Sequence, residues 1–242
     1  MKGELISLEG PECSGKGTQA QLLYEYLQQK GIPVHLMHEP GGSYYGEAIR
    51  ALLKFPERAL KAIYHELSGH GDFPLFEQYA AISDNGHLDI KRTAETELFL
   101  FEATRAEYAA KLKPLLDGGD VIISDRLHDS TVAYQGGGRG LPMTDIDLMN
   151  KIALRGIWPD LTFLLDIPVE VMLDRMSRQR DEKNAFFEKH CDQAFFERVR
   201  EAYVAIALSE PKRFIIIDGN QPIETVFKQI RAYVDELLGI ED

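Results

Sequence analysis

The residue types that could do chemistry gather first in one short segment. Residues 10–18 read Gly-Pro-Glu-Cys-Ser-Gly-Lys-Gly-Thr and directly follow a short apolar run, Leu5–Glu9. A strand that ends in a glycine-rich turn and then opens a helix is typical of a phosphate-binding loop, because glycine lets successive backbone N–H groups point inward at anionic oxygens. The helix start adds the positive end of its dipole, and Lys16 can reach the outer phosphates of a nucleoside triphosphate. A chance glycine turn is disfavoured by four fixed positions in this context, so we expect the chain to bind a nucleoside triphosphate.

The residues expected to contact ATP are Gly10, Glu12, Cys13, Ser14, Gly15, Lys16, Gly17 and Thr18. One of them departs from the commonest form of the loop, because Gly17 follows the lysine and the first hydroxyl comes at Thr18. Adenylate-kinase-type loops read Gly-Lys-Gly-Thr in the same way. We therefore expect Thr18 to contact Mg²⁺, directly or through water.

An acidic residue and an arginine, Asp125 and Arg126, stand directly after another apolar run. An acidic residue that ends a strand in a protein with a phosphate-binding loop is placed to hold Mg²⁺, directly or through water. Arg126 can form two parallel hydrogen bonds to one phosphate. A plain surface ion pair is the alternative, and Lys16 elsewhere in the chain makes it less attractive.

A second pair lies within the broad apolar stretch at 94–117. Phe101 and Arg105 are four residues apart and therefore share one face of a helix. A flat ring one turn before a guanidinium could stack on a nucleobase and clamp the phosphate of the same nucleotide. From this helix alone, a core phenylalanine beside an arginine that reaches out to water is an equally good interpretation.

Five short apolar runs predict the strands that position these residues. The runs are Leu5–Glu9, Val34–His38, Val121–Ser124, Leu161–Asp166 and Phe214–Asp218. Helical periodicity predicts helices at 16–30, 43–54, 94–117, 144–155, 168–179, 192–209 and 222–238. Nearly continuous apolar runs are typical of parallel strands covered on both faces. The expected fold is therefore α/β, a doubly wound five-stranded parallel sheet flanked by helices, with ligands beyond the carboxyl ends of the strands.

The length of 242 residues fits a single domain, 1–242. Residues from about 55 to 93 mix prolines and glycines with short apolar pieces and are interpreted as an insertion. Residues from about 177 to 192 are dense in charge and are expected to form a lid loop. The insertion contains His65, His70 and His87, but without a cysteine or a tight spacing they do not predict a metal site.

The net charge of −12 argues against nucleic acid and anionic membranes as partners. Any phosphate substrate must therefore be held by local cations. No segment is apolar for long enough to cross a membrane, and the first residues lack the apolar region of a signal peptide. The two cysteines, Cys13 and Cys191, form no disulfide framework, so we expect a cytoplasmic protein.

Several motifs, in the same order, resemble those of thymidylate kinases, a family of P-loop nucleoside monophosphate kinases. The matching segments are residues 10–18, Glu39-Pro40-Gly41-Gly42, Phe101 with Arg105, Asp125-Arg126 and Ser130-Thr131-Val132-Ala133-Tyr134-Gln135-Gly136. Pro159-Asp160-Leu161-Thr162 and the run from Leu165 to Glu170 extend the resemblance to nearly the whole chain outside 55–93. The run Ala-Tyr-Gln-Gly-Gly-Gly-Arg-Gly is highly specific, whereas the phosphate loop alone is not.

The resemblance implies transfer of the ATP γ-phosphoryl to dTMP, which gives dTDP and ADP, with Mg²⁺ as cofactor and with a homodimer as the assembly. The dTMP-binding residues that it implies are Glu12, Phe101, Arg105, Arg126, Thr131, Tyr134 and Gln135. Phe101 would stack on thymine, while Arg105 and Arg126 would hold the monophosphate. Thr131 would lie near the base edge, and the other three residues would lie around the deoxyribose.

In bacterial-type members of the family, a lid loop supplies arginines to the phosphate that is transferred. Arg175, Arg178 and Arg180 are the candidates in this chain, and Arg180 lies deepest in the loop. A solvated charged helix face is the alternative for all three. The catalytic residues expected from the resemblance are Lys16, Arg126, Arg178 and Arg180.

Three features depart from the family pattern, and one of them is the insertion at about 55–93. His38 stands where the family often has an arginine, and the Asp-Arg pair usual near the end of the lid is absent around 184–188. Two other functions therefore stay open beside thymidylate kinase activity. One is a kinase for another pyrimidine nucleotide or a deoxynucleoside, and the other is a P-loop protein that binds a nucleotide without turnover.

Overall fold

The computed structural model describes residues 2–56, 59–60, 62–63, 66, 92–178 and 191–241. Its centre is an all-parallel sheet with the strand order β2-β3-β1-β4-β5. The strands are β1 (Leu5–Glu9), β2 (Val34–His38), β3 (Val121–Asp125), β4 (Leu161–Asp166) and β5 (Phe214–Asp218). The five predicted strands and the predicted fold class are confirmed, with β3 one residue longer than expected. The chain order runs to one side of β1 and then to the other, and such a reversal opens a crevice at the carboxyl ends of the strands.

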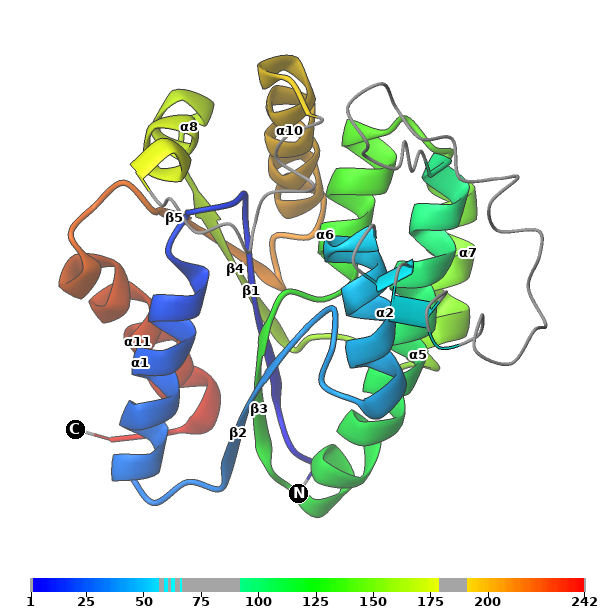
Figure 1. Ribbon diagram of the computed structural model, residues 1–242. Coiled ribbons are helices and arrows are strands. Elements are labelled where there is room, and N and C mark those ends of the chain that lie inside the picture. The colour runs from blue at the N-terminus through cyan, green and yellow to red at the C-terminus, as the bar shows by residue number, and fades with distance from the viewer. Residues whose placement is uncertain are drawn as a thin grey trace, which may run out of the picture.

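Helices cover both faces of this sheet (Figure 1). They are α1 (Lys16–Gln29), α2 (Tyr44–Lys54), α5 (Ala94–Gly118), α6 (His128–Thr131), α7 (Met143–Leu154), α8 (Val169–Arg178), α10 (Gln193–Ser209) and α11 (Ile223–Leu238). Helices α1 and α11 lie side by side on one face, whereas α5, α7 and α10 lie on the other. Each of the seven predicted helices ends within one residue of the expected position.

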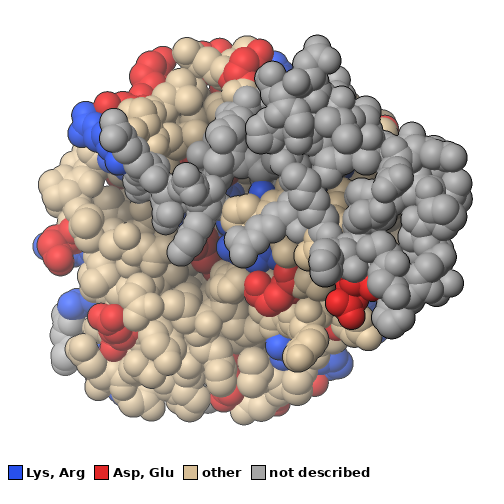
Figure 2. All heavy atoms as spheres, in the orientation of Figure 1, with Lys and Arg blue, Asp and Glu red and all other residues tan. Residues whose placement is uncertain are grey.

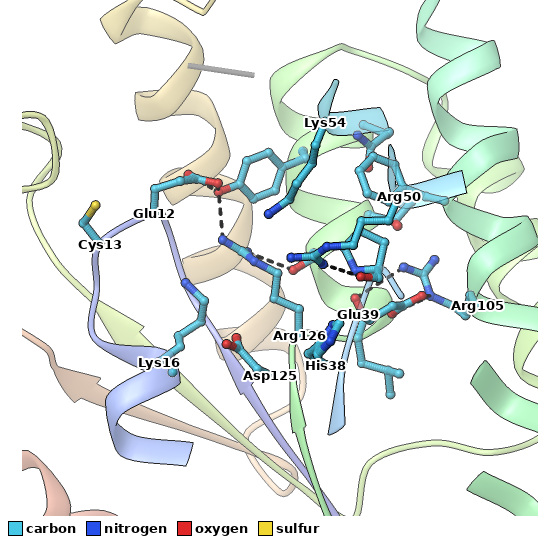
Figure 3. Close-up of a pocket in the computed structure, with 18 of the residues that line it drawn as sticks. Glu12, Cys13, Lys16, His38, Glu39, Arg50, Lys54, Arg105, Asp125 and Arg126 are labelled. Atoms are coloured by element: carbon cyan, nitrogen blue, oxygen red, sulfur yellow. Dashed lines mark hydrogen bonds and ion pairs between the residues drawn. The ribbon is translucent and has the colours of Figure 1, made fainter. Parts of the chain in front are cut away.

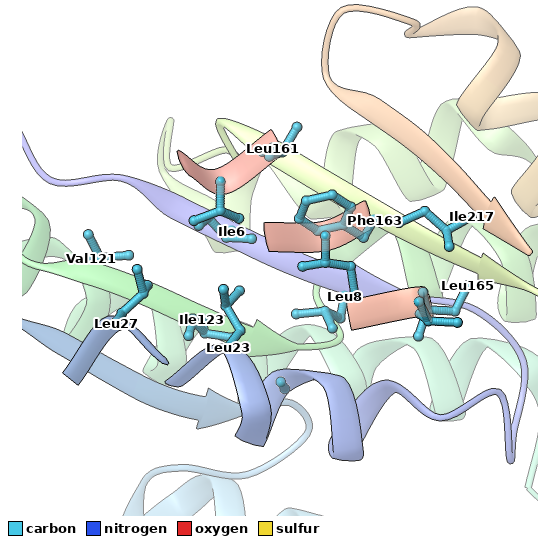
Figure 4. Close-up of a cluster of buried hydrophobic side chains, with 14 residues drawn as sticks. Ile6, Leu8, Leu23, Leu27, Val121, Ile123, Leu161, Phe163, Leu165 and Ile217 are labelled. Atoms are coloured by element: carbon cyan, nitrogen blue, oxygen red, sulfur yellow. The ribbon is translucent and has the colours of Figure 1, made fainter. Parts of the chain in front are cut away.

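Alternate residues of the strands supply the cores on the two faces. Ile6 and Leu8 of β1 pack toward α1 and α11, together with Phe163 of the neighbouring strand β4 (Figure 4). Leu5, on the opposite face of the same strand, packs against α5. Strands buried on both faces need apolar residues at successive positions, which explains why their sequences are continuous rather than alternating.

A seven-residue π-helix, η1 (Val132–Gly138), follows α6 and was not expected from the sequence. Its glycines allow it to lie directly against α10. A methyl group added at Gly137 would come 2.5 Å from Ala202 Cβ, and one at Gly138 would come 2.5 Å from Phe195 Cε2. The π-helix is therefore held close to α10, with Tyr134 and Gln135 in its middle.

The predicted insertion and the predicted lid lie largely outside the described residues, and so do His65, His70, His87 and Arg180. Among the helices that the structure does describe, none is long and apolar enough to cross a membrane.

Candidate active site

A cavity of about 450 Å³ opens beyond the carboxyl ends of β1, β2 and β3. Figure 2 shows lysine and arginine atoms in a hollow near the middle of this face. All seven residues implied to bind dTMP line the cavity, as do six of the eight residues expected to bind ATP. The other two, Gly10 and Ser14, are buried residues of the loop. The fold therefore brings the two predicted groups of residues into one space.

The phosphate-binding loop has the backbone that inward-pointing N–H groups require. Gly10, Cys13 and Gly15 adopt positive φ angles of 137°, 55° and 98°. A side chain at Gly10 would also come 2.5 Å from the carbonyl oxygen of Leu165. Gly15 precedes α1 without a side-chain cap, so the first N–H groups of this helix are left for an anion.

The ammonium of Lys16 lies against its own loop. It donates hydrogen bonds to the carbonyl oxygens of Gly10 (3.0 Å) and Pro11 (2.6 Å). Its side chain is almost fully buried, and burial lowers the pKa of Lys16 to about 8. A triphosphate in the loop would offer this ammonium charged acceptors in place of neutral carbonyls.

Asp125 and Thr18 offer oxygen ligands of the kind that Mg²⁺ prefers. Both line the cavity, and the Asp125 carboxylate accepts no hydrogen bond from any described residue. Gly17, which precedes Thr18, lies close to Asp125, because a methyl group there would come 3.5 Å from Asp125 Oδ2. In the described part of the chain, no three His, Cys, Asp or Glu side chains gather to hold a metal ion. The donors therefore fit an ion that also takes ligands from phosphates and water.

Arg126 is fixed at the centre of the cavity (Figure 3). Its φ of 72° is unusual for a residue with a side chain, and the Ser124 hydroxyl holds this conformation by donating to the Arg126 carbonyl at 2.6 Å. The Arg126 guanidinium donates to the Gly10 carbonyl at 3.1 Å and to Glu12 at 3.3 Å. It also lies 5.3 Å from the ring centre of Tyr134.

A buried glutamate ties the end of β1 to the segment that follows Arg126. The Glu9 carboxylate accepts hydrogen bonds from the Leu127 amide (2.7 Å), the Ser130 hydroxyl (2.6 Å) and the Tyr203 hydroxyl (3.0 Å). Burial, and then the charge of Asp129, raise the pKa of Glu9 to about 7. These bonds fix the entry to α6, and with it the floor of the cavity.

Arg105 lies in the cavity wall beside Phe101, but its charge is already balanced. The residue is 1% exposed, and its guanidinium pairs with the carboxylates of Glu39 (3.0 Å) and Glu102 and donates to Asn150 Oδ1 at 2.9 Å. Burial raises the pKa of Glu39 to about 7. Among the described contacts, Nη2 is the nitrogen with the weakest partner, the Leu127 carbonyl at 3.4 Å. Its predicted role at dTMP stays a prediction.

The three remaining residues that the resemblance implies for dTMP come from α6 and η1. The hydroxyl of Tyr134 donates to the Glu12 carboxylate. Gln135 donates to Glu97 at 2.8 Å, and Glu97 also pairs with Arg139 at 3.2 Å. Thr131 is buried and also lines the cavity. The predicted Thr-x-x-Tyr-Gln group therefore lies on one short segment that faces the cavity.

The predicted lid arginines lie in different places. Arg175 donates to the Cys13 carbonyl at 3.1 Å and to Asn220 Oδ1 at 3.0 Å, so it joins the phosphate-binding loop to the segment after β5. Arg178 is exposed and pairs with Asp174 at 2.7 Å, one turn earlier in α8. Arg180 lies outside the described residues. Their role at the transferred phosphate stays a prediction.

Two cations of the cavity were not expected from the sequence. Arg50 and Lys54 lie one turn apart on α2, and both line the cavity. Arg50 donates to the Pro40 carbonyl. Their spacing of four on a helix that follows β2 was a signal that could have found them, because like charges at this spacing repel unless an anion offsets them.

Comparisons with known proteins point to one family. The family model for thymidylate kinase matches residues 8–67 and 84–230. A thymidylate kinase of Pseudomonas fluorescens is 36% identical over 240 residues, which cover 98% of each chain. One of Desulfovibrio desulfuricans is 37% identical over 241 residues, which cover 96% of this chain and 95% of that one.

A crystal structure points in the same direction. The thymidylate kinase of Ehrlichia chaffeensis superposes with a TM-score of 0.67 and 28% sequence identity, and the superposition covers 97% of this chain and 99% of that one. The residues that the family model leaves unmatched within its span, 68–83, fall inside the predicted insertion.

Proposed function

Because the chain belongs to the thymidylate kinase family, we propose that its cavity transfers the γ-phosphoryl of ATP to dTMP, giving dTDP and ADP. One observation carries the assignment of this activity to the cavity. The phosphate-binding loop with Lys16 forms one end of a continuous space, and Phe101 with the α6–η1 segment forms the other. A donor triphosphate and an acceptor nucleotide can therefore meet over Arg126.

The donor side consists of the loop N–H groups, the start of α1 and Lys16. Together they offer several donors and one full charge to the β- and γ-phosphates. Thr18 and Asp125 would hold Mg²⁺, which would offset the negative charge of the phosphates. Lys16 stays in contact with the γ-phosphate while the bond between the β- and γ-phosphates of ATP breaks. It can do so because its ammonium can exchange the loop carbonyls for a charged acceptor.

The acceptor side holds dTMP by its base, sugar and phosphate. In this proposal the Phe101 ring stacks on thymine and Thr131 borders the edge of the base. Arg105 borders the phosphate of the same nucleotide. Tyr134 closes the space beside the deoxyribose, with its hydroxyl held by Glu12. A ribose 2′-hydroxyl would be buried against this ring without a good partner, which costs about 1–3 kcal/mol, or roughly tenfold to a hundredfold in kcat/KM.

No general base is needed for the transfer. The second pKa of a phosphate monoester is about 6, so the acceptor is mostly a dianion at neutral pH. Catalysis then rests on bringing two anions into line and on offsetting the charge of the transferred oxygens. In this proposal Lys16 and Arg126 do so, and Arg178 and Arg180 also act on the transferred phosphate.

We also propose that the enzyme works as a cytoplasmic homodimer, as the family resemblance implies. Large apolar side chains on α5 and α7 support an assembly of two copies, because Phe99, Leu148 and Ile152 are each more than half exposed. Neither Cys13 nor Cys191 forms a disulfide with a residue that the structure describes, which suits a reducing compartment.

A coupled assay of ADP release tests the proposal directly. Purified protein with ATP and Mg²⁺ is given dTMP, dUMP, dCMP, UMP or thymidine, and kcat/KM is measured for each. We expect the highest value for dTMP and at least a tenfold lower value for UMP. The matched control is Lys16→Ala, which should bind dTMP but transfer no phosphoryl group.

Two results would overturn the assignment. A higher kcat/KM for another pyrimidine nucleotide or for thymidine would make the protein a kinase of that substrate. Binding of ATP without transfer to any acceptor would make it a nucleotide-binding protein without turnover.

A further inference from the structure

Lys54 is the last residue of α2, and its side chain reaches into the cavity (Figure 3). The side chain is partly buried, yet its ammonium forms no hydrogen bond or ion pair with any residue that the structure describes. Lysines on the outer surface differ, since Lys113 and Lys151 each pair with an aspartate one turn away. The three N–H donors of Lys54 are therefore directed at the cavity without an acceptor.

A lysine at the end of a helix often serves only to satisfy the last carbonyl groups. Lys54 is not needed for this purpose, because Arg92 already donates to the carbonyls of Leu52 (2.7 Å) and Leu53 (3.0 Å). The same two bonds fix the last turn of α2 against the start of α5. Arg92 thus leaves the Lys54 ammonium available and holds the backbone of the last turn of α2 in place.

The surroundings of Lys54 call for an anion. Arg50 lies one turn before Lys54 on α2, and Arg126 lies across the cavity. The positive charges of both arginines disfavour the positive charge of Lys54. Glu12 and Asp125 offset only part of this repulsion. Most donors of Arg126 are engaged, by Gly10, Glu12, Ser130 and Tyr203. Three cations converge on one space, and a dianion there would relieve their repulsion.

We propose that Lys54 binds the phosphate of the acceptor nucleotide, on the side opposite Arg126, and contacts neither its base nor its sugar. The inference rests on the proposed function for the existence of an acceptor nucleotide. The helix that carries Lys54 packs against α5, which carries Phe101 and Arg105, and this places Lys54 on the acceptor side of the cavity. Lys16, on the donor side, comes from the opposite wall (Figure 3).

Comparison of a nucleotide with its nucleoside isolates the phosphate contact. Affinities of dTMP and thymidine are measured by calorimetry for the parent, Lys54→Met and Lys54→Arg, together with KM for ATP. A charge-assisted hydrogen bond is worth roughly tenfold to a hundredfold in affinity. We expect Lys54→Met to weaken dTMP by that factor and to leave thymidine and ATP within twofold, whereas Lys54→Arg keeps most of the dTMP affinity.

Lys113→Met is the matched control, since it removes one lysine charge from the exposed face of α5. Its dTMP affinity should equal that of the parent. Thermal unfolding checks that the variants are folded, and the partial exposure of Lys54 makes a large loss of stability unexpected.

Three outcomes would overturn the role of Lys54. Equal losses for dTMP and thymidine would mean that Lys54 shapes the cavity, a loss confined to ATP would place it on the donor side, and no loss would remove it from the site. Failure of the proposed function is distinguishable, because the parent would then prefer another nucleotide. In that case the same comparison is made with the preferred monophosphate and its nucleoside, and a loss confined to the monophosphate would still support Lys54.

Discussion

At the scale of single residues, the cavity keeps its ionisable groups in place by burying them with partners. Glu9 accepts three hydrogen bonds, and Glu39 shares the Arg105 guanidinium with Glu102. Burial disfavours the charge on these carboxyls and on Lys16, so their pKa values move toward neutrality. The site is consequently sensitive to pH in the range where its substrate also titrates.

The first prediction concerns the pH dependence of ATP use. The pKa of Lys16 is lowered to about 8, and only the protonated ammonium attracts the triphosphate. Since kcat/KM for a substrate reports the enzyme before that substrate binds, kcat/KM for Mg-ATP at dTMP concentrations well below its KM should fall as the pH rises through about 8, by up to tenfold per pH unit. In the complex, the phosphates favour the charged form, so kcat should fall only at higher pH.

Lys16→Arg provides the control for the fall of kcat/KM at high pH, because a guanidinium stays charged at every pH that is measured. Its activity should be lower than that of the parent but should not decline between pH 8 and pH 9.5. A parent profile that stays flat to pH 10 would show that Lys16 remains charged without nucleotide.

The second prediction is that Arg105→Met destabilises the protein more at high pH than at low pH. The substitution leaves Glu39 and Glu102 without their shared cation, which typically costs about 3–5 kcal/mol. The folded-state pKa of Glu39 is already raised to about 7, so this carboxyl contributes stability that is lost as the pH rises from its unfolded value of 4.5 through 7. Without Arg105 its pKa rises further and the loss extends above pH 7.

Denaturant unfolding at pH 5.5 and pH 8.5 measures this difference. Lys113→Met removes an exposed ion pair with Asp117 and should cost less than about 1 kcal/mol at both pH values. If Arg105→Met lowers the free energy of unfolding equally at pH 5.5 and pH 8.5, the loss reflects packing rather than unpaired carboxylates. Loss of dTMP binding in Arg105→Met would then need a stability correction before it is read as a lost contact.

The sequence predicts residues well where one segment carries the whole chemical pattern. Lys16 and Asp125 follow from their neighbours in the chain, and the cavity contains both. The spacing of Arg50 and Lys54 by itself indicates an anion, but their place at this cavity depends on Arg126, which is far away in the sequence. The ion pair between Arg105 and Glu39 could not be predicted for the same reason, because it forms only when the segment after β2 packs against α5.

At the scale of elements, the π-helix η1 decides where the acceptor side of the cavity lies. It presents Tyr134 and Gln135 to the cavity, while its glycines pack on α10. Apolar periodicity predicted the strands and the seven long helices, because buried faces repeat regularly along them. The π-helix has no such repeat over seven residues, and its glycine run could equally have been a loop.

The third prediction tests the packing of this element. Gly137→Ala would bring a methyl group to 2.5 Å from Ala202 Cβ and 2.9 Å from the Arg198 carbonyl oxygen. Such overpacking typically costs about 1–3 kcal/mol, and η1 must shift away from α10 to relieve it. Unfolding free energy should fall by that amount, and KM for dTMP should rise while KM for ATP stays the same.

Gly118→Ala is the control, because a methyl group there meets nothing within 4 Å. Its stability should be equal to or slightly above that of the parent, as alanine is favoured over glycine in a helix. Unchanged stability and KM in Gly137→Ala would mean that η1 is not held tightly against α10.

At the scale of the whole molecule, the site exists because the strand order places β1 between β3 and β4. The loop after β1, the Asp125-Arg126 pair after β3 and the residues after β2 then converge at one edge of the sheet. The number of strands and their parallel direction could be predicted from apolar runs and intervening helices. The order of the strands could not, since nothing in a single strand specifies its neighbours.

The fourth prediction concerns assembly. Leu148 and Ile152 lie one turn apart on α7 and are 58% and 60% exposed, and Phe99 on the adjacent helix α5 is 59% exposed. Apolar side chains of this size are stabilised by a partner surface, and a stable interface buries about 800 Å² on each copy. The protein should therefore sediment as a dimer at micromolar concentration, and Leu148→Asp combined with Ile152→Asp should shift it to a monomer.

Ile223→Asp is the matched control, because Ile223 is an exposed apolar residue at the start of α11, which covers the opposite face of the sheet (Figure 1). This variant should remain a dimer, since an aspartate in the first turn of a helix is well tolerated. A parent that sediments as a monomer would contradict the proposed assembly outright. A double variant that stays dimeric would move the interface away from α7, because two buried carboxylates facing their copies could not remain charged in an apolar contact.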